Sequence, residues 1–293
     1  MLQITRPRTV RTVVEMRDIA RDWRRAGDLV ALVPTMGGLH EGHLSLIRAA
    51  RRRARRVIAT IFVNPAQFGA GEDFAAYPRD EIRDAELLAA AGCDLIYAPP
   101  LSEIYPDGFA TSVTVDTGTN SLCGAHRPGH FDGVTTVVCK LLNQAQPDYA
   151  VFGEKDWQQL VTIRRMVRDL DMPIRIASSP TVREADGLAM SSRNRYLDPA
   201  QRRIAAKLNK ALFASADHIA HGLPLDRVTA ACSKALLSAG FDSVDYLEAR
   251  DAHTLDPVST YSSGTETRLF AAARLGKTRL IDNVPVERTG LTE

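Results

Sequence analysis

Two histidines beside a glycine-rich segment are the first residues in this sequence whose types and spacing could do chemistry. His40 and His43 lie in PTMGGLHEGH, residues 34–43, directly after an apolar run that predicts a strand. Histidines three residues apart share one face of a helix, so both imidazoles can reach the same group. The glycines allow close backbone approach, and the free N–H groups at a helix start favour phosphate. The segment therefore predicts a phosphate site at the start of a helix over residues 44–53.

Two other motifs with similar residues do not fit this segment. A zinc-protease helix needs His-Glu-x-x-His with its ligands four residues apart, whereas His40 and His43 are three apart. A Walker A loop ends in Gly-Lys-Ser/Thr, whereas Gly42 is followed here by His43 and Leu44. A single histidine more often packs or caps, but a pair beside glycines favours binding. The remaining interpretation is a His-x-Gly-His element, which is similar to the nucleotide-binding signature of adenylating and nucleotidyl-transferring Rossmann-like enzymes.

Two further segments carry groups suited to a triphosphate. GEKDWQQ, residues 153–159, follows a predicted strand, and Lys155 supplies a mobile positive charge for phosphate oxygens. In MSSRNR, residues 190–195, two serines and an arginine can grip phosphate from the opposite side of a cleft. This segment resembles the mobile lysine-containing loop of aminoacyl-tRNA synthetases, with other residues in the same role. Together these donors are expected to stabilise a leaving pyrophosphate more in the transition state than in the ground state.

Buried strands that alternate with helices must position these segments. Short apolar runs predict the strands, and segments of helical period lie between them. This alternation predicts an α/β fold with a Rossmann-like parallel sheet, in which ligands bind beyond the carboxyl ends of the strands. We therefore expect the chemistry in the loops 34–43, 64–68 and 153–159. The predicted strands are residues 29–33, 57–63, 94–98, 149–152 and 174–177.

The pattern changes after Pro180. Residues 199–220 and 225–239 read as amphipathic helices, and residues 244–249 and 269–282 read as strands, the latter with a hairpin turn at 274–278. Strands and helices no longer alternate here. We therefore expect a Rossmann-like ligand-binding domain over residues 1–181, a smaller α+β lid domain over residues 182–293, and a cleft between them.

Composition and charge favour a folded cytoplasmic protein that binds neither nucleic acid nor membrane. Lys and Arg total 37 against 35 Asp and Glu, so a net charge of +2 gives no general attraction to a polyanion. Six arginines crowd residues 48–56, but no aromatic residues interleave to stack on bases, which favours a solvated helix face. The four cysteines lack the spacing of a zinc site or a disulfide framework. No apolar run approaches the ~20 residues needed to span a bilayer.

The complete set of motifs identifies a family. The order and spacing of these segments, from about residue 29 to residue 283, resemble the pantothenate synthetases. That resemblance implies a two-step reaction. The carboxylate of (R)-pantoate displaces pyrophosphate from ATP to give pantoyl-adenylate, and the amine of β-alanine then releases AMP to give pantothenate. The motifs are residues 34–43, FVNPAQF at 62–68, YPR at 77–79, RPGHF at 127–131, GEKDWQQ at 153–159 and MSSRNRY at 190–196.

The resemblance also implies partners and site residues. ATP is expected as a substrate with Mg²⁺ beside it, the assembly is expected to be a homodimer, and His43 is expected to donate a proton. The catalytic candidates are His40, His43, Lys155, Ser191, Ser192 and Arg193. The residues implied in ATP binding are Met36, Gly37, Gly38, Leu39, His40, Glu41, Gly42, His43, Gly153, Glu154, Lys155, Asp156, Val182, Met190, Ser191, Ser192 and Arg193. Those assigned to pantoate are Pro34, Thr35, Met36, Gln67, Gln159, Val134, Val137 and Val138, with Gln67 also assigned to β-alanine.

Residue chemistry supports part of this pantoate site. A neutral glutamine amide, at Gln67 or Gln159, orients a carboxylate by hydrogen bonds without quenching its charge, so the oxygen remains nucleophilic. Val134, Val137 and Val138 share one helix face and can form an apolar wall for the gem-dimethyl group, although the same pattern also fits plain core.

Three more residues are candidates with open alternatives. Arg127 and His130 could fix β-alanine or close the site, or could simply form surface hydrogen bonds. The family commonly has two adjacent acidic residues that assist magnesium after Tyr-Pro-Arg, but here those positions read Arg83 and Asp84. Asp84 is therefore the single metal candidate, and the ATP phosphates with water are expected to supply most of the coordination shell.

Two other functions are alternatives to this one. A nucleotidyltransferase would share the His-x-Gly-His element, but its pocket for a phosphate-bearing acceptor should be basic, whereas the glutamines and valines predict a neutral, apolar one. A nucleic-acid-binding protein would use the arginines of residues 48–56 and would show steeply salt-dependent binding.

Overall fold

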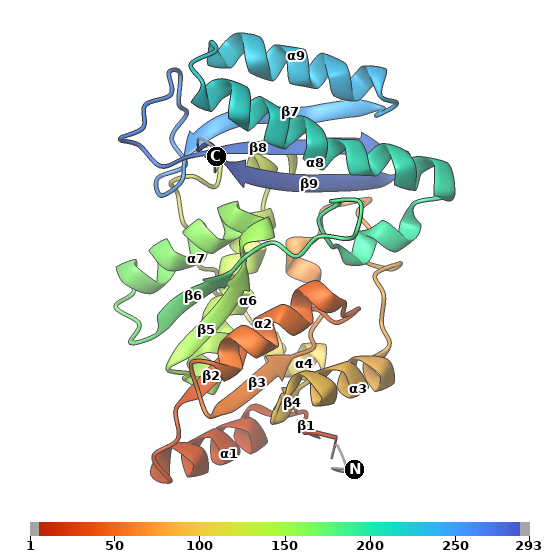
Figure 1. Ribbon diagram of the computed structural model, residues 1–293. Coiled ribbons are helices and arrows are strands. Elements are labelled where there is room, and N and C mark those ends of the chain that lie inside the picture. The colour runs from red at the N-terminus through yellow and green to blue at the C-terminus, as the bar shows by residue number, and fades with distance from the viewer. Residues whose placement is uncertain (1–5, 288–293) are drawn as a thin grey trace.

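The computed structural model describes residues 6–287, which form a large parallel sheet and a small antiparallel sheet with helices against both (Figure 1). The large sheet has six strands, all parallel, in the order β1-β4-β3-β2-β5-β6. The predicted α/β fold with a Rossmann-like sheet is confirmed. The strands are β1 (Arg8–Val10), β2 (Val30–Val33), β3 (Arg56–Thr60), β4 (Leu95–Tyr97), β5 (Tyr149–Gly153) and β6 (Arg175–Ser179).

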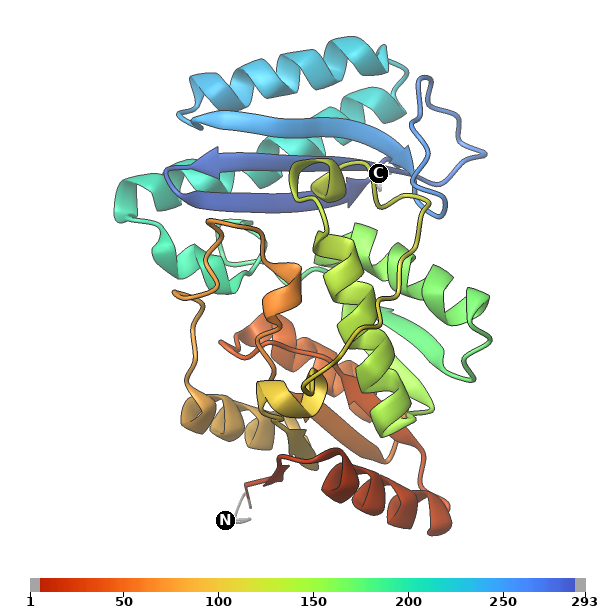
Figure 2. The same ribbon diagram turned by 180° about the vertical axis from the view of Figure 1, so that it is seen from behind.

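Helices cover both faces of the large sheet because successive strand residues point to opposite sides. Val30 and Leu32 of β2 join one hydrophobic cluster, and Ala31 and Val33 join another on the opposite face. The view from behind in Figure 2 brings the first set of helices to the front. That set is α1 (Val13–Arg25), α6 (His130–Ala145) and α7 (Trp157–Asp169), and the other face carries α2 (Glu41–Arg51) and α3 (Glu81–Ala91).

The strand order reverses beside β2. The chain proceeds from β2 outward to β3 and β4, and later returns to β5 on the other side of β2. Such a reversal opens a crevice beyond the carboxyl ends of the strands. The topology therefore brings the three predicted loops, residues 34–43, 64–68 and 153–159, to the same end of three adjacent strands. Short helical turns lie in the connections: η1 (Pro65–Gln67), α4 (Leu101–Ile104), α5 (Cys123–His126), η2 (Glu154–Asp156) and η3 (Ser192–Tyr196).

The C-terminal part is built on the small sheet, whose strands are ordered β7-β8-β9. One face of β8, with Leu269 and Ala271, packs on the two long helices, whereas Phe270 and Ala272 point the other way and join a cluster with Phe131 of α6. The small sheet is thus held between its own helices and the large-sheet part. Its elements are α8 (Pro199–Ala220), α9 (Leu225–Ser238), β7 (Ser243–Asp251), β8 (Thr267–Leu275) and β9 (Thr278–Pro285).

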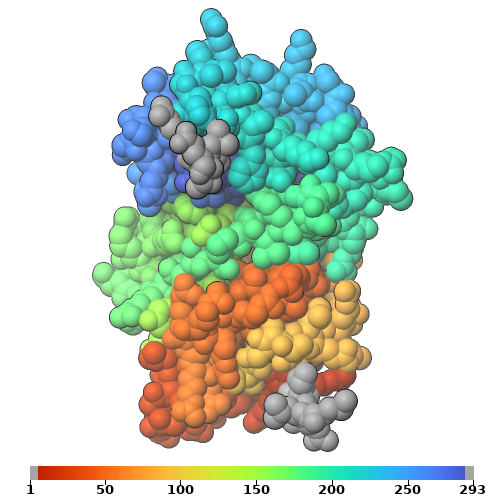
Figure 3. Space-filling model, in the orientation of Figure 1, coloured from red at the N-terminus to blue at the C-terminus, as the bar shows by residue number. Residues whose placement is uncertain are grey.

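The space-filling view shows how the two parts meet. The segment around residues 180–200, in green, lies directly against the orange surface of the N-terminal part and beneath the blue C-terminal part (Figure 3). The predicted boundary between residues 181 and 182 stays a prediction. No helix among residues 6–287 is long and apolar enough to cross a membrane.

Some predicted elements differ from the structure. The strand predicted over residues 57–63 ends at Thr60, because the chain then leaves the sheet and Phe62 donates its N–H to the carbonyl of Thr35 at 3.1 Å. The helix predicted over residues 44–53 begins earlier, at Glu41. The three-residue strand β1 was not predicted, since its single buried residue, Val10, makes no apolar run.

Candidate active site

The glycine loop, residues 34–43, leaves β2 and turns sharply into α2. Gly37 and Gly38 have φ values of +81° and +62°, in the left-handed region that favours glycine. Two successive backbone N–H groups, of Gly38 and Leu39, donate to the buried carboxylate of Asp84 at 2.8 and 2.9 Å. The loop backbone is therefore held in a fixed turn just before His40.

The two histidines cap α2 with their own rings. The Nδ1 atom of His40 accepts the N–H of Gly42 at 3.1 Å, and the Nδ1 atom of His43 accepts the N–H of His40 at 3.4 Å. The ring centroids are 4.1 Å apart. Because Nδ1 is an acceptor in both rings, the proton of each neutral imidazole lies on Nε2. Each ring can then donate a hydrogen bond from Nε2.

Both histidines are neutral at physiological pH. Burial lowers the pKa of His40 from 6.5 to about 4, and the charges of Lys155 and Arg195 act in the same direction. Burial also lowers the pKa of His43 well below 6.5, with further lowering by His40 and Lys155. A neutral imidazole can donate a hydrogen bond from Nε2 to a phosphate oxygen without carrying a full positive charge. The expected role of His43 as a proton donor stays a prediction.

Lys155, unlike the two neutral histidines, contributes a full positive charge to this region. It lies in η2, directly after β5, and its side chain is 19% exposed with the ammonium 3.8 Å from Asp156. Its backbone is fixed from the C-terminal part, because the side-chain amide of Asn283 donates to the carbonyls of Glu154 and Lys155, both at 2.9 Å. The position of this lysine therefore depends on β9 as well as on β5.

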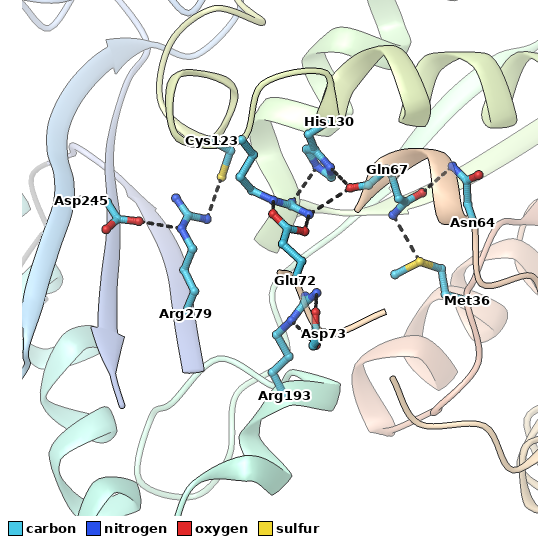
Figure 4. A network of polar contacts seen from close by, with 11 residues as sticks. Met36, Asn64, Gln67, Glu72, Asp73, Cys123, His130, Arg193, Asp245 and Arg279 are labelled. Atoms are coloured by element: carbon cyan, nitrogen blue, oxygen red, sulfur yellow. Dashed lines mark hydrogen bonds and ion pairs between the residues drawn. The ribbon is translucent and has the colours of Figure 1, made fainter. Parts of the chain in front are cut away.

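The segment that contains Ser191, Ser192 and Arg193 reaches the glycine loop from the other side. The Ser192 hydroxyl is buried and donates to the carbonyl of Gly38 at 3.1 Å, and Ser191 caps η3 by accepting the N–H of Arg193. Arg193 does not present a free guanidinium, since its Nε and Nη2 atoms donate to Asp73 at 2.9 and 2.8 Å (Figure 4). The predicted grip on phosphate thus starts from an arginine that is already paired.

Two connected chambers, of about 230 and 730 Å³, lie between these segments. Both are lined by Arg127, His130, Lys155, Gln159 and Arg193, so the two chambers meet at these residues. Most of the predicted site residues line the smaller chamber. They are Pro34, Thr35, Met36, His40, Gly42, His43, Gln67, Arg127, His130, Val134, Val137, Val138, Gly153, Lys155, Asp156, Gln159, Val182, Met190, Ser191, Ser192 and Arg193.

Five of the residues predicted to bind ATP line neither chamber. Leu39 is core, at 1% exposure, and Glu41 forms an exposed ion pair with Arg48. Glu154 accepts a hydrogen bond from Ser178 at 2.9 Å. Gly37 and Gly38 shape the turn through their backbone, so any contribution of these five to ATP binding stays a prediction.

The glutamines and valines predicted to bind pantoate give the smaller chamber a neutral and apolar part of its lining. Gln67 donates from Nε2 to the Sδ atom of Met36 at 3.2 Å and accepts from Asn64 at 3.1 Å (Figure 4). Gln159 lines the same chamber. Val134, Val137 and Val138 line the chamber and also belong to the core of the large sheet. Their contact with pantoate stays a prediction.

Arg127 and His130 form one hydrogen-bonded group that lines both chambers, and their role in fixing β-alanine or closing the site stays a prediction. Arg127 pairs with Glu72 at 2.6 Å and donates to the Nε2 atom of His130 at 2.9 Å. His130 in turn donates from Nδ1 to the carbonyl of Gln67 at 2.8 Å. Burial, together with the charge of Arg127, lowers the pKa of His130 to about 4, which keeps the ring neutral.

Three residues of this site were not predicted from the sequence. Glu72 and Asp73 hold the two arginines, and Asn283 holds the lysine segment. The adjacent acids that follow two glycines in the sequence GAGED, residues 69–73, were a visible but ambiguous signal. Asn283 gave none, because its partners are backbone carbonyls about 130 residues away in the chain.

The arginine-rich segment at the end of α2 is compensated by acids. Arg48 pairs with Glu41, Arg51 with Asp94, and Arg55 and Arg56 both pair with Asp28. These pairs support the interpretation of a solvated helix face over that of a nucleic-acid patch.

The residues described do not form a resident metal site. No group of three or more His, Cys, Asp or Glu residues within residues 6–287 could hold a metal ion. Both oxygens of the predicted candidate, Asp84, accept backbone N–H groups, and the residue lines neither chamber.

Comparison with known proteins gives close relatives over nearly the whole chain. The chain is 55% identical over 278 residues to the pantothenate synthetase of Paramagnetospirillum magneticum, which covers 95% of this chain and 97% of that protein. It is 53% identical over 284 residues to the pantothenate synthetase of Caulobacter vibrioides, with 97% and 100% covered.

Solved structures agree with the sequence relatives. The crystal structure of pantothenate synthetase from Thermus thermophilus aligns with a TM-score of 0.88 and 47% identity, over 96% of this chain and 99% of that one. A pantoate-β-alanine ligase from Francisella tularensis, crystallised with β-γ ATP and β-alanine, aligns with a TM-score of 0.81 and 32% identity, over 96% and 98%.

A family model described as pantoate-β-alanine ligase matches residues 8–285. The resemblance seen in the motifs is therefore confirmed over the whole fold, and the chain belongs to the pantoate-β-alanine ligase family, the pantothenate synthetases.

Proposed function

We propose that this protein is an ATP-dependent, AMP-forming ligase that condenses (R)-pantoate with β-alanine to give pantothenate, AMP and pyrophosphate. One observation carries the proposal. His40 and His43, each with a free Nε2 donor, and Lys155 line the same small chamber as Gln67 and Gln159, which supports this proposal. The histidines and the lysine suit a triphosphate, and the uncharged glutamines suit the carboxylate of an organic acid.

The first step joins the pantoate carboxylate to the α-phosphate of ATP. The carboxylate oxygen forms a bond to phosphorus while the bond to the β-phosphate oxygen breaks, and pyrophosphate leaves with the electron pair. The side chains of Gln67 and Gln159 orient the carboxylate without neutralising it. His40, His43 and Lys155 stabilise the charge that develops on the leaving group, which is the main source of catalysis in phosphoryl and nucleotidyl transfer.

The second step uses the mixed anhydride of pantoate and AMP. The neutral amine of β-alanine attacks the acyl carbon, the bond from that carbon to the phosphate oxygen breaks, AMP leaves and the nitrogen loses a proton. Water must be kept away from the anhydride during this step. The buried hydrogen bond from Ser192 to the carbonyl of Gly38 joins the C-terminal part to the glycine loop, and we propose that the segment from residue 182 acts as the lid.

Magnesium enters this proposal only as a companion of ATP. The protein residues described do not fit a resident ion, so the phosphates and water would supply its coordination shell. When bound it would add positive charge at the phosphates. We also propose a homodimer in the cytoplasm, as the family resemblance predicts, and the mass of the purified protein by light scattering tests the dimer.

An assay of AMP release with single omissions tests the function. With ATP, pantoate, β-alanine and Mg²⁺ present, AMP and pantothenate should form in equal amounts, and leaving out pantoate or β-alanine should stop sustained turnover. Exchange of labelled pyrophosphate into ATP should require pantoate but not β-alanine. Exchange that requires a phosphate-bearing acceptor instead would establish a nucleotidyltransferase and overturn the proposal.

A further inference from the structure

Asp84 is buried beneath the glycine loop, outside both chambers. It lies in the first turn of α3 and is 2% exposed. Its Oδ2 atom accepts the N–H of Gly38 at 2.8 Å, and its Oδ1 atom accepts the N–H of Leu39 at 2.9 Å. Both oxygens are thus occupied by successive backbone amides, which form the kind of concavity that binds an anion.

The loop fits closely against this carboxylate. A Cβ atom added to Gly37 would lie 3.0 Å from the Asp84 Oδ2 atom, and one added to Gly38 would lie 3.1 Å from the Cβ of Pro78. Ser192 holds the carbonyl of Gly38 from the opposite side at 3.1 Å. The backbone directly before His40 is therefore fixed from α3 and from the C-terminal part at once.

We propose that Asp84 is a positioning residue for adenylate formation and not a magnesium ligand. Leu39 is the residue before His40, so the carboxylate sets the point from which the capping histidine and the first turn of α2 begin. His43 follows from the same turn, since its Nδ1 atom accepts the N–H of His40. The carboxylate thereby aims both Nε2 donors without touching the substrate.

Metal ligation does not fit the same atoms. Each oxygen of Asp84 already accepts a buried backbone N–H, and an ion that displaced Gly38 or Leu39 would leave that N–H without an acceptor, which is unfavourable. No group of three or more His, Cys, Asp or Glu residues in the described chain could hold an ion, and Asp84 lines neither of the two chambers.

The test compares Asp84→Asn and Asp84→Ala with a matched control on the same helix. The control is Asp80→Asn, which changes the exposed N-cap of α3, where a carboxylate oxygen accepts the N–H of Arg83 at 3.1 Å. Three quantities are measured for each variant: the single-turnover rate of pantoyl-adenylate formation, the Mg²⁺ concentration that gives half the maximal rate, and the amide exchange rates of Gly38 and Leu39 by NMR.

We expect Asp84→Asn to slow adenylate formation at least tenfold at saturating ATP and Mg²⁺. One of its two acceptors becomes an NH₂ donor that faces a backbone N–H, so exchange of one of the two amides should accelerate. The half-saturating Mg²⁺ concentration should stay within twofold of the parent, and Asp80→Asn should leave all three quantities unchanged. Asp84→Ala should be slower still, and Asp84→Asn carries the test if the alanine variant does not fold.

Two results would overturn this inference. The first is a rise of tenfold or more in the half-saturating Mg²⁺ concentration with the rate restored at high Mg²⁺, which would make Asp84 a metal ligand. The second is a parent-like adenylation rate despite faster amide exchange. The inference rests on the proposed function, but the unmodified protein tests that function in the omission assay, so the two can fail separately.

Discussion

The two sides of the smaller chamber hold their polar groups in different ways. On the glycine-loop side, His40 and His43 are neutral, and backbone hydrogen bonds fix their rings. On the opposite side, Arg127 and Arg193 are charged, and the carboxylates of Glu72 and Asp73 hold them. The first side is ready for a phosphate as it stands. On the second side the positive charges are already partly neutralised by carboxylates of the protein, so an anion there meets a weaker attraction.

The variant His43→Ala should have the largest effect, because it removes one of the preorganised donors on the glycine-loop side. Removing one preplaced donor to a developing oxyanion slows such reactions by about 10²–10³. We expect adenylate formation, measured by pantoate-dependent pyrophosphate exchange, to fall by this factor while the circular dichroism spectrum stays unchanged. His218→Ala, which replaces an exposed histidine on α8, is the control and should retain the parent rate. A parent-like rate for His43→Ala would remove this residue from the mechanism.

The pH dependence of stability should reveal buried neutral histidines on both sides. Burial lowers the pKa of His40 and of His130 to about 4, against 6.5 when unfolded. Unfolding therefore takes up protons below pH 6.5, so the stabilising contribution is complete above that pH and is lost as pH falls towards 4. Each such group can add up to about 1.4 kcal/mol per pH unit to the slope.

Urea unfolding between pH 7.5 and 4.5 measures that slope. His130→Asn should reduce it by up to one proton, whatever the variant does to stability at pH 7.5. An unchanged slope would mean that His130 titrates alike in the folded and unfolded states.

The smallest expected effect concerns the ion pair between Asp73 and Arg193 on the charged side. Asp73→Asn removes the negative charge that holds Arg193 and leaves the guanidinium free to meet phosphate. A partly exposed ion pair of this kind contributes up to about 1 kcal/mol, so the KM for ATP should fall by a factor of about 2–5 with kcat little changed. Asp18→Asn, in the exposed pair with Arg21 on α1, is the matched control. A raised KM would show instead that Asp73 orients Arg193 for binding.

Much of the fold and the site could be predicted from local sequence. The apolar runs around Leu32 and Ile58 predicted the parallel strands, and the loops that follow them contain most of the residues lining the smaller chamber. The partners of those residues could not be predicted in the same way. Glu72, Asp73 and Asn283 act on groups 55, 120 and about 130 residues away, and no local period or spacing encodes such a pair.

Asp84 shows most clearly what the sequence could not decide. Its type and its place after Tyr-Pro-Arg predicted a metal candidate. The sequence does not show whether the oxygens of a carboxylate face water or accept hydrogen bonds from the backbone. The chain by itself determined the reaction class, since residue types at fixed spacing specify phosphate donors and neutral amides. Only the tertiary structure decided which charges are already paired, which histidines are kept neutral and which carboxylate holds the loop, because burial and long-range hydrogen bonds set all three.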